Sequence, residues 1–278
     1  MQDVFAYCAE LVRAADRDRY LTTLFAPASY RGALFALYAF ASELKRVREV
    51  AREPLPGEIR LQWWSEVLGG ERDGEASANP VASALLQTIA RHRLDTAAPI
   101  DIVEAHQFDL YDEPMRTVAD LEDYARRTSS ALITLAAKIL CGSEMADAAR
   151  QAGIAYAIAA LARALPLHAS RAQLYVPLEV LERHGVQASD VYAGRSSRGL
   201  NAALAELRDL ARIHLAAVRQ SLSELPPDGL PAFLPVALVG PSLRRLDRRD
   251  AFSPVEIPPW RRQWLIWRAA RNPARIAR

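Results

Sequence analysis

The spacing of apolar residues along this chain restricts its fold to helices. Residues 200–222 carry apolar side chains at steps of three and four, which places them in one stripe along a helix. Residues 32–41, GALFALYAFA, are apolar on every side, a pattern typical of a buried central helix. Residues 118–141 continue the helical spacing until Gly142, and the alanine-rich segment 146–164 favours close helix packing.

Strand signals are weak, and β-like sequence is confined to Leu174–Val176. Clusters of proline and glycine mark the expected breaks between helices, at Pro54–Gly57, Gly69–Pro80, Pro226–Pro231 and Pro254–Pro259. No linker is long enough to separate domains. The sequence therefore predicts one all-α domain over residues 1–278, built of roughly ten helices, in which residues 250–278 are candidates for a peripheral segment.

Composition and charge exclude several classes of protein. Apolar residues make up 51% of the chain and charged residues 24%, as in ordinary globular proteins. A net charge of +2 argues against a general nucleic-acid binder, which usually carries a much larger basic excess. Cys8 and Cys141 are far apart in the sequence, which fits a reducing compartment and excludes a disulfide framework. The acidic N-terminus resembles neither a secretory signal nor a transit peptide, so the expected location is the cytoplasm.

Several separate segments carry a resemblance to a known enzyme family: residues 16–49, 59–68, 79–85, 120–142 and 155–177. In this order and at this spacing they resemble the squalene/phytoene synthase superfamily, the head-to-head prenyl transferases. The resemblance implies an isoprenoid-synthase-type helical bundle around a central cavity. In that superfamily two aspartate-rich motifs bind Mg²⁺ and hold the substrate diphosphates, because clustered divalent cations stabilise the charge of the departing diphosphate.

The first aspartate-rich motif departs from the superfamily pattern. It reads DDxxD after YAFC, whereas this chain has Lys45, Arg46 and Glu49 at the matching positions after Tyr38. Cations cannot ligate Mg²⁺, and one carboxylate cannot assemble a cluster of hard cations. Lys45, Arg46 and Arg48 either line an anionic pocket or form a solvated helix face, and charge runs are more often the latter.

The second motif is also altered. It reads QLTNILRDVxxD, and its arginine is kept as Arg163, whereas its two aspartates fall on Ala164 and His168. A buried Arg163 needs a partner, for which Glu43 or Glu49 is the candidate. His168 is expected at a helix end, because Pro166 precedes it. Further candidates for contacts to the cavity or to an anion are Arg31, Tyr38, Arg171 and Tyr175. We expect no catalytic residue and no metal ligand.

The altered positions are similar to those of a non-catalytic branch, the assembly factor 6 family of respiratory complex I. Glu43-Leu44 and the segment Leu161–Arg171 carry this second resemblance. It implies an assembly factor without cofactor or nucleic acid, whose partner is a membrane-arm subunit of complex I or an assembly intermediate. Two alternatives stay open. One is an active head-to-head prenyl transferase, the only case in which Mg²⁺ is expected, and the other is an isoprenoid- or lipid-binding protein.

The C-terminal segment PPWRRQWLIWRAAR combines tryptophan and arginine at helical spacing. Trp260, Trp264 and Trp267 stand at i, i+4 and i+7, with arginines between them. This pattern is typical either of a helix in a membrane interface or of a stripe packed on the domain with arginines reaching water. Packing is the favoured interpretation, because a stripe at helical spacing is mostly core. In the other case the helix is a partner surface, peripheral to the inner membrane.

Overall fold

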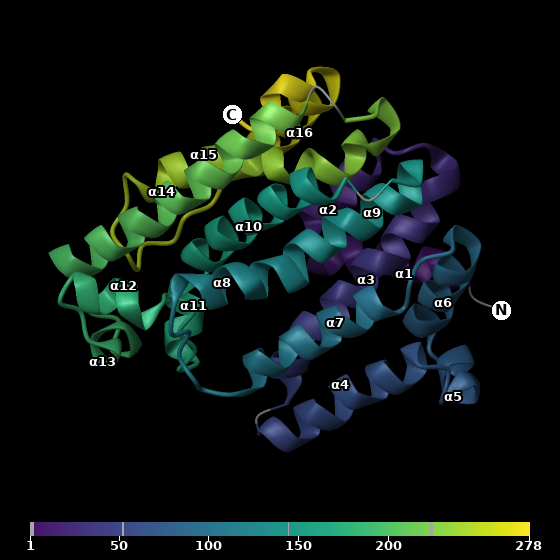
Figure 1. Cartoon of the computed structure of the whole chain (residues 1–278), viewed down its shortest axis with the longest axis horizontal. Coiled ribbons are helices and arrows are strands. Elements are labelled where there is room, and N and C mark those ends of the chain that lie inside the picture. The colour runs from purple at the N-terminus through teal and green to yellow at the C-terminus, as the bar shows by residue number, and fades with distance from the viewer. Residues whose placement is uncertain (1–2, 52, 144, 223–224) are drawn as a thin grey trace. The chain divides into compact units, whose positions relative to one another are not determined.

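The computed structural model describes residues 3–51, 53–143, 145–222 and 225–278, and these residues form helices without any strand. The predicted all-α class is therefore confirmed. The contacts divide the chain into two compact units. Unit 1 comprises residues 1–110, 131–146 and 225–235, and unit 2 comprises residues 111–130, 147–224 and 236–278. Figure 1 shows the helices coloured in chain order from purple to yellow.

Unit 1 is built around a long central helix. Its α-helices are α1 (Val4–Ala15), α2 (Arg17–Thr23), α3 (Ala28–Val50), α4 (Pro54–Leu68), α5 (Asp73–Ala78), α6 (Pro80–His92), α7 (Ala97–Ala105) and α9 (Ala131–Cys141). A 3₁₀ turn, His106–Leu110, follows α7. Helix α3 is buried without interruption over residues 33–42, as the all-apolar segment predicts, and α1, α6 and α9 pack around it. Beyond residue 42 one side of α3 is exposed, so the charged side chains near its C-terminal end are accessible.

The adjacent tryptophans of α4 divide between core and surface. Trp64 is buried, and its ring meets the Phe40 ring of α3 edge-on at 5.0 Å between centroids. Trp63 is half-buried, and its Nε1 donates a hydrogen bond to Glu75 Oε2 at 2.9 Å. Neighbouring residues of a helix point about 100° apart, so only one of the two can face the core.

Unit 2 contains the second long helix. Its α-helices are α8 (Val118–Ala125), α10 (Ala146–Arg163), α11 (Leu165–Ser170), α12 (Leu178–Arg183), α13 (Ala188–Tyr192), α14 (Arg198–Ser221), α15 (Val239–Leu246) and α16 (Pro259–Arg271). The stripe predicted for α14 is buried, from Leu200 to Val218. Helix α10 approaches the segment Arg126–Ser130 so closely that a Cβ added to Gly153 would lie 2.3 Å from the Cα of Ser130.

The described residues contain sixteen α-helices, so the expectation of roughly ten is wrong. Polar caps and prolines start new helices where the apolar pattern runs on: Asp16 caps α2, and Pro166 stands in the first turn of α11. The run 118–141 is interrupted by a π-helical turn at Arg126–Ser130, where the Thr128 hydroxyl donates to the Tyr124 carbonyl.

Two smaller observations complete the fold. The β-like stretch Leu174–Val176 forms no strand, although the Leu174 carbonyl accepts a hydrogen bond from the backbone N–H of Met115 at 2.9 Å. Among the described helices, none combines the length and the apolar character needed to cross a membrane.

Candidate functional site

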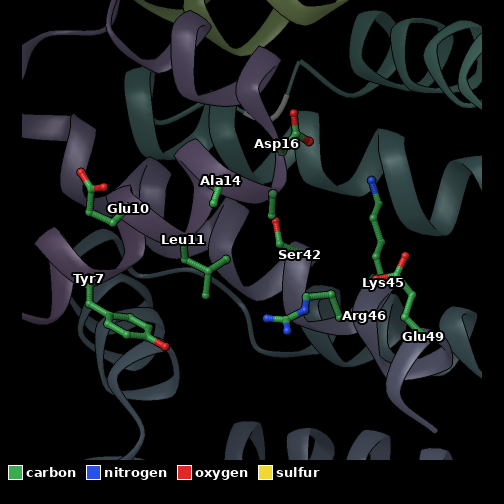
Figure 2. A pocket seen from close by; sticks show the side chains of 10 residues that line it. Tyr7, Glu10, Leu11, Ala14, Asp16, Ser42, Lys45, Arg46 and Glu49 are labelled. Atoms are coloured by element: carbon green, nitrogen blue, oxygen red, sulfur yellow. The ribbon is translucent and has the colours of Figure 1, made fainter.

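A pocket of ≈ 670 Å³ in unit 1 collects the side chains at the first altered motif. It lies between α1 and α3 and is lined by Tyr7, Glu10, Leu11, Ala14, Ala15, Asp16, Ser42, Lys45, Arg46 and Glu49 (Figure 2). Lys45 and Glu49 are four residues apart and therefore share a face of α3 with Arg46 beside them. The structure thus brings Lys45, Arg46 and Glu49 together at one pocket. Of the three cations for which the sequence left open a pocket or a solvated helix face, Lys45 and Arg46 line this pocket and Arg48 does not.

The charges of this pocket are mixed. Figure 2 shows the Lys45 ammonium and the Arg46 guanidinium pointing in different directions, and the Arg46 guanidinium lies 3.6 Å from the Glu43 carboxylate. Within the described residues, no group of three or more His, Cys, Asp or Glu side chains is arranged to hold a metal ion. Lys45 and Arg46 offer no ligand to a cation, and two of the three carboxylates at the pocket pair with arginines, Glu10 with Arg13 and Asp16 with Arg19. The side chains present therefore do not fit a Mg²⁺ cluster.

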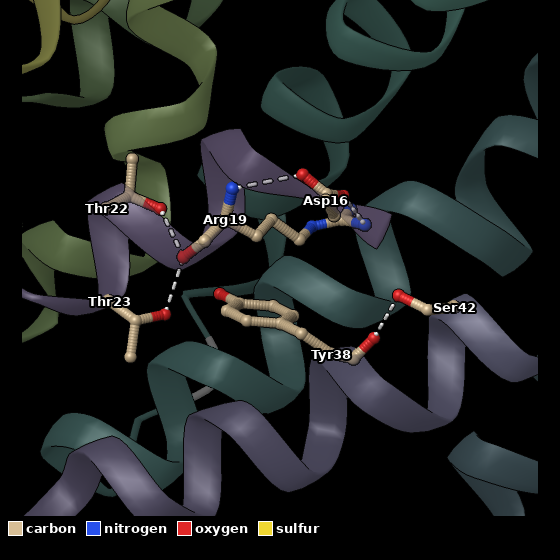
Figure 3. A network of polar contacts seen from close by, with 6 residues as sticks. All are labelled: Asp16, Arg19, Thr22, Thr23, Tyr38 and Ser42. Atoms are coloured by element: carbon tan, nitrogen blue, oxygen red, sulfur yellow. Dashed lines mark hydrogen bonds and ion pairs between the residues drawn. The ribbon is translucent and has the colours of Figure 1, made fainter. Parts of the chain in front are cut away.

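A buried polar network lies beside the pocket, and most of its members were not predicted from the sequence. The Arg19 side chain is 5% exposed and lies 3.2 Å from the Asp16 carboxylate. Its guanidinium sits over the Tyr38 ring, 5.2 Å from the centroid, as a cation–π contact (Figure 3). The only sequence signal for this network was the dense charge of residues 16–19, DRDR, directly before the apolar α3 region.

The network is completed by hydroxyl groups that satisfy backbone carbonyls. Thr22 and Thr23 donate to the Arg19 carbonyl at 3.1 and 2.7 Å, and Ser42 donates to the Tyr38 carbonyl at 2.8 Å (Figure 3). Burial raises the pKa of Tyr38 to about 12, with Arg19 lowering it and Asp16 raising it by smaller amounts. Tyr38 is not part of the pocket lining, and it keeps its proton at neutral pH.

Arg31, the other cavity candidate of unit 1, has a local role. Its Nε donates a hydrogen bond to the Ala26 carbonyl at 2.9 Å, just before α3 begins. Arg31 does not line the pocket between α1 and α3.

The second altered motif lies in unit 2, where α10 ends at Arg163 and α11 begins at Leu165 after Ala164. His168 lies in the last turn of α11, as expected, and its ring packs on Tyr175 at 4.6 Å between centroids. These two rings line an apolar cavity of ≈ 10 Å³, about the space of one water molecule. Burial, followed by the charge of Arg171, lowers the pKa of His168 to about 4.

The two altered motifs therefore lie in different units. Their predicted arrangement around one cavity, and the predicted pairing of Arg163 with Glu43 or Glu49, remain predictions.

His168 makes the stability of the chain sensitive to acid. The imidazole of His168 takes up a proton near pH 4 in the folded protein and near pH 6.5 in the unfolded chain. The neutral ring therefore stabilises the folded state above pH 6.5, and this stabilisation is lost as the pH falls toward 4. Between pH 7.5 and pH 5 we expect the wild type to lose about 2 kcal/mol more unfolding free energy than His168→Phe, which has an aromatic ring that cannot take up a proton. Urea titrations at both pH values measure this. Parallel pH dependence of the two proteins would contradict it.

The tryptophans of α16 face outward, so the favoured interpretation of a packed stripe is wrong. Trp260, Trp264 and Trp267 are 69%, 46% and 47% exposed, whereas Ile266 and Ala269 on the opposite face are buried. Ile266 and Ala269 thus make the contact with the core, and the larger indole rings lie at the surface. The guanidinium of Arg268 lies 4.2 Å from the ring centroid of Trp264, and that of Arg271 lies 5.0 Å from Trp267.

Comparisons with known proteins give a family and a fold. The model of the squalene/phytoene synthase family matches residues 12–268. The human protein "NADH dehydrogenase (ubiquinone) complex I, assembly factor 6" is 31% identical over 246 residues, covering 88% of this chain and 74% of its own. Phytoene synthase of Thermus thermophilus is 28% identical over 221 residues, covering 77% and 72%. A dehydrosqualene synthase solved in complex with ligand has the same fold, with a TM-score of 0.82, 17% identity and coverage of 95% and 94%.

Proposed function

This chain belongs to the squalene/phytoene synthase family, and we propose that it is a non-catalytic assembly factor for respiratory complex I. One observation supports the proposal: Lys45 and Arg46 line the pocket between α1 and α3. By the motif resemblance described for residues 38–49, we infer that these two positions correspond to aspartates of the prenyl transferases. A diphosphate can leave a prenyl chain only if its developing charge is stabilised, and clustered Mg²⁺ supplies that stabilisation in this family. An ammonium and a guanidinium offer no ligand to such a cluster.

The target of the proposed activity follows from the relatives. The relatives from human and rat, each 31% identical to this chain, are named as assembly factors of complex I. We infer that this chain acts by protein contact on a membrane-arm subunit or an assembly intermediate, from the cytoplasmic side of the inner membrane. The phytoene synthase relative makes prenyl transfer the competing function.

Deletion of the gene separates the two functions. We expect membranes of the deletion strain to lose most of their NADH:quinone reductase activity and assembled complex I, while squalene and phytoene pools stay unchanged. The wild-type gene should restore complex I, and so should Glu49→Gln, which removes the one carboxylate at the first motif. Normal complex I together with depleted isoprenoids would reverse the assignment in favour of the enzyme.

An assay with the purified protein tests directly whether the chain catalyses prenyl transfer. Incubation with farnesyl or geranylgeranyl diphosphate and Mg²⁺ should yield no squalene or phytoene above the level found with EDTA. A product that forms with Mg²⁺ and disappears with EDTA would overturn the non-catalytic part of the proposal.

A further inference from the structure

A second pocket, in unit 2, is dominated by arginine. It has a volume of ≈ 490 Å³ and lies between α15, α16 and the loop that joins them. Its charged lining consists of Arg244, Arg245, Arg248, Arg249, Arg261 and Glu256. Five guanidinium groups thus face a single carboxylate, in a space typical of small-molecule sites.

The acidic residues near this pocket are engaged elsewhere. The Asp247 carboxylate pairs with Arg208 at 2.9 Å and also with Arg212. Asp250 accepts hydrogen bonds from Ser196 at 2.7 Å and from Asn201 at 2.9 Å, and these bonds lower its pKa. Neither aspartate lines the pocket, so its positive charge is left largely uncompensated.

The arginines themselves show the effect of this excess charge. Partial burial lowers the pKa of Arg244, the guanidiniums of Arg261, Arg212 and Arg248 lower it further, and Asp247 opposes them by a smaller amount. Within the described part of the chain, Arg248 and Arg249 make no ion pair. An arrangement that brings five like charges together with one carboxylate among them is stabilised when an anion enters it.

The pocket continues into the exposed tryptophan face. Arg261 lines the pocket, and Trp264 and Arg268 follow at i+3 and i+7 on the same side of α16. Trp260 and Trp267 lie within a quarter turn of Trp264. One side of α16 therefore presents three exposed indole rings directly beside the arginine pocket.

We propose that the arginine pocket and the tryptophan face of α16 together dock on an anionic phospholipid bilayer, with lipid phosphates held by the arginines. The guanidinium fork binds phosphate oxygens in pairs, and indole rings settle at the level of lipid headgroups, where an apolar body and a polar N–H are both satisfied. A soluble phosphate would use the arginines but leave the three rings in water. This inference concerns the purified chain and holds whether or not the chain assists complex I.

Vesicle flotation tests the docking surface. At about 0.15 M salt, we expect binding to vesicles with about 30 mol% phosphatidylglycerol to be at least tenfold stronger than to phosphatidylcholine vesicles, and to weaken strongly at about 0.5 M salt. Arg248→Glu combined with Arg249→Glu should reduce binding at least tenfold, and so should Trp264→Ser combined with Trp267→Ser. Circular dichroism checks that each variant is folded.

The matched control changes charge by the same amount at another place. Arg17 and Arg198 are exposed at the first positions of α2 and α14, where glutamate is tolerated, so Arg17→Glu with Arg198→Glu should bind vesicles as the wild type does. If the control variant and the pocket variant lose vesicle binding equally, net charge alone explains the binding and the proposal is overturned. Equal binding to both vesicle types, or full displacement by millimolar glycerophosphate, would overturn it in favour of a protein partner or a soluble phosphate.

Discussion

Gly153→Ala should lower the unfolding free energy by at least ~3 kcal/mol, through the addition of one methyl group. The added Cβ would lie 2.3 Å from the Cα, N and Oγ of Ser130, far inside carbon contact distance. Two of these atoms are backbone, and the Ser130 hydroxyl is held by a 2.9 Å hydrogen bond to the Arg150 carbonyl. The clash can therefore be relieved only by moving α10 away from the π-helical turn. Urea unfolding followed by circular dichroism measures the loss.

Gly74→Ala is the matched control for this substitution. Gly74 lies in α5, and a Cβ there meets nothing within 4 Å. Alanine forms helices better than glycine does, so this variant should be as stable as the wild type or more stable by up to about 1 kcal/mol. Unfolding of both variants at the same urea concentration would contradict the close approach of α10 to Ser130.

Arg19→Met should cost about 3 kcal/mol, because it leaves a partly buried carboxylate without its cation. Asp16 is only 18% exposed, and its carboxylate lies 3.2 Å from the Arg19 guanidinium. Methionine fills a similar volume, so the loss reports the charge and the contact with the Tyr38 ring rather than a cavity. Arg19→Lys should recover part of it. Thermal and urea unfolding of the purified variants provide the measurement.

The exposed counterpart of this pair lies nearby in the sequence. Arg13 and Glu10 have the same spacing, at 2.8 Å, but their side chains are 60% and 64% exposed. Water screens such a pair, so Arg13→Met should change the unfolding free energy by no more than about 0.5 kcal/mol. Comparable losses at positions 13 and 19 would show that burial does not determine the strength of the Asp16–Arg19 pair.

The all-α fold could be predicted because apolar spacing repeats over long segments. The stripe of α14 and the all-apolar run of α3 each extend over several turns, so errors at single positions do not change the interpretation. Short helices such as α11 and α13 could not be predicted, because six or five residues carry too little periodicity. The π-helical turn at Arg126–Ser130 arises from local hydrogen bonding, which an apolar pattern does not record.

The candidate sites were only partly accessible to sequence reasoning. Lys45, Arg46 and Glu49 could be found because a family motif fixes their positions on one helix. Arg19 could not, because its burial depends on a ring that is nineteen residues away in the sequence, Tyr38. The orientation of α16 was misjudged for a related reason: spacing shows that Trp260, Trp264 and Trp267 share a face, but not which face the rest of the unit covers.

The pocket between α1 and α3 also makes the chain unusually simple to label. Lys45 and Lys138 are the only lysines in the sequence, since almost all of the basic residues are arginine. Lys45 is exposed at the pocket, whereas Lys138 is half-buried on α9. An amine-directed ester therefore has, apart from the chain's α-amino group, one well-exposed target. A cross-linker or fluorophore attached at Lys45 would place a covalent handle on the α1–α3 pocket of the otherwise unmodified protein.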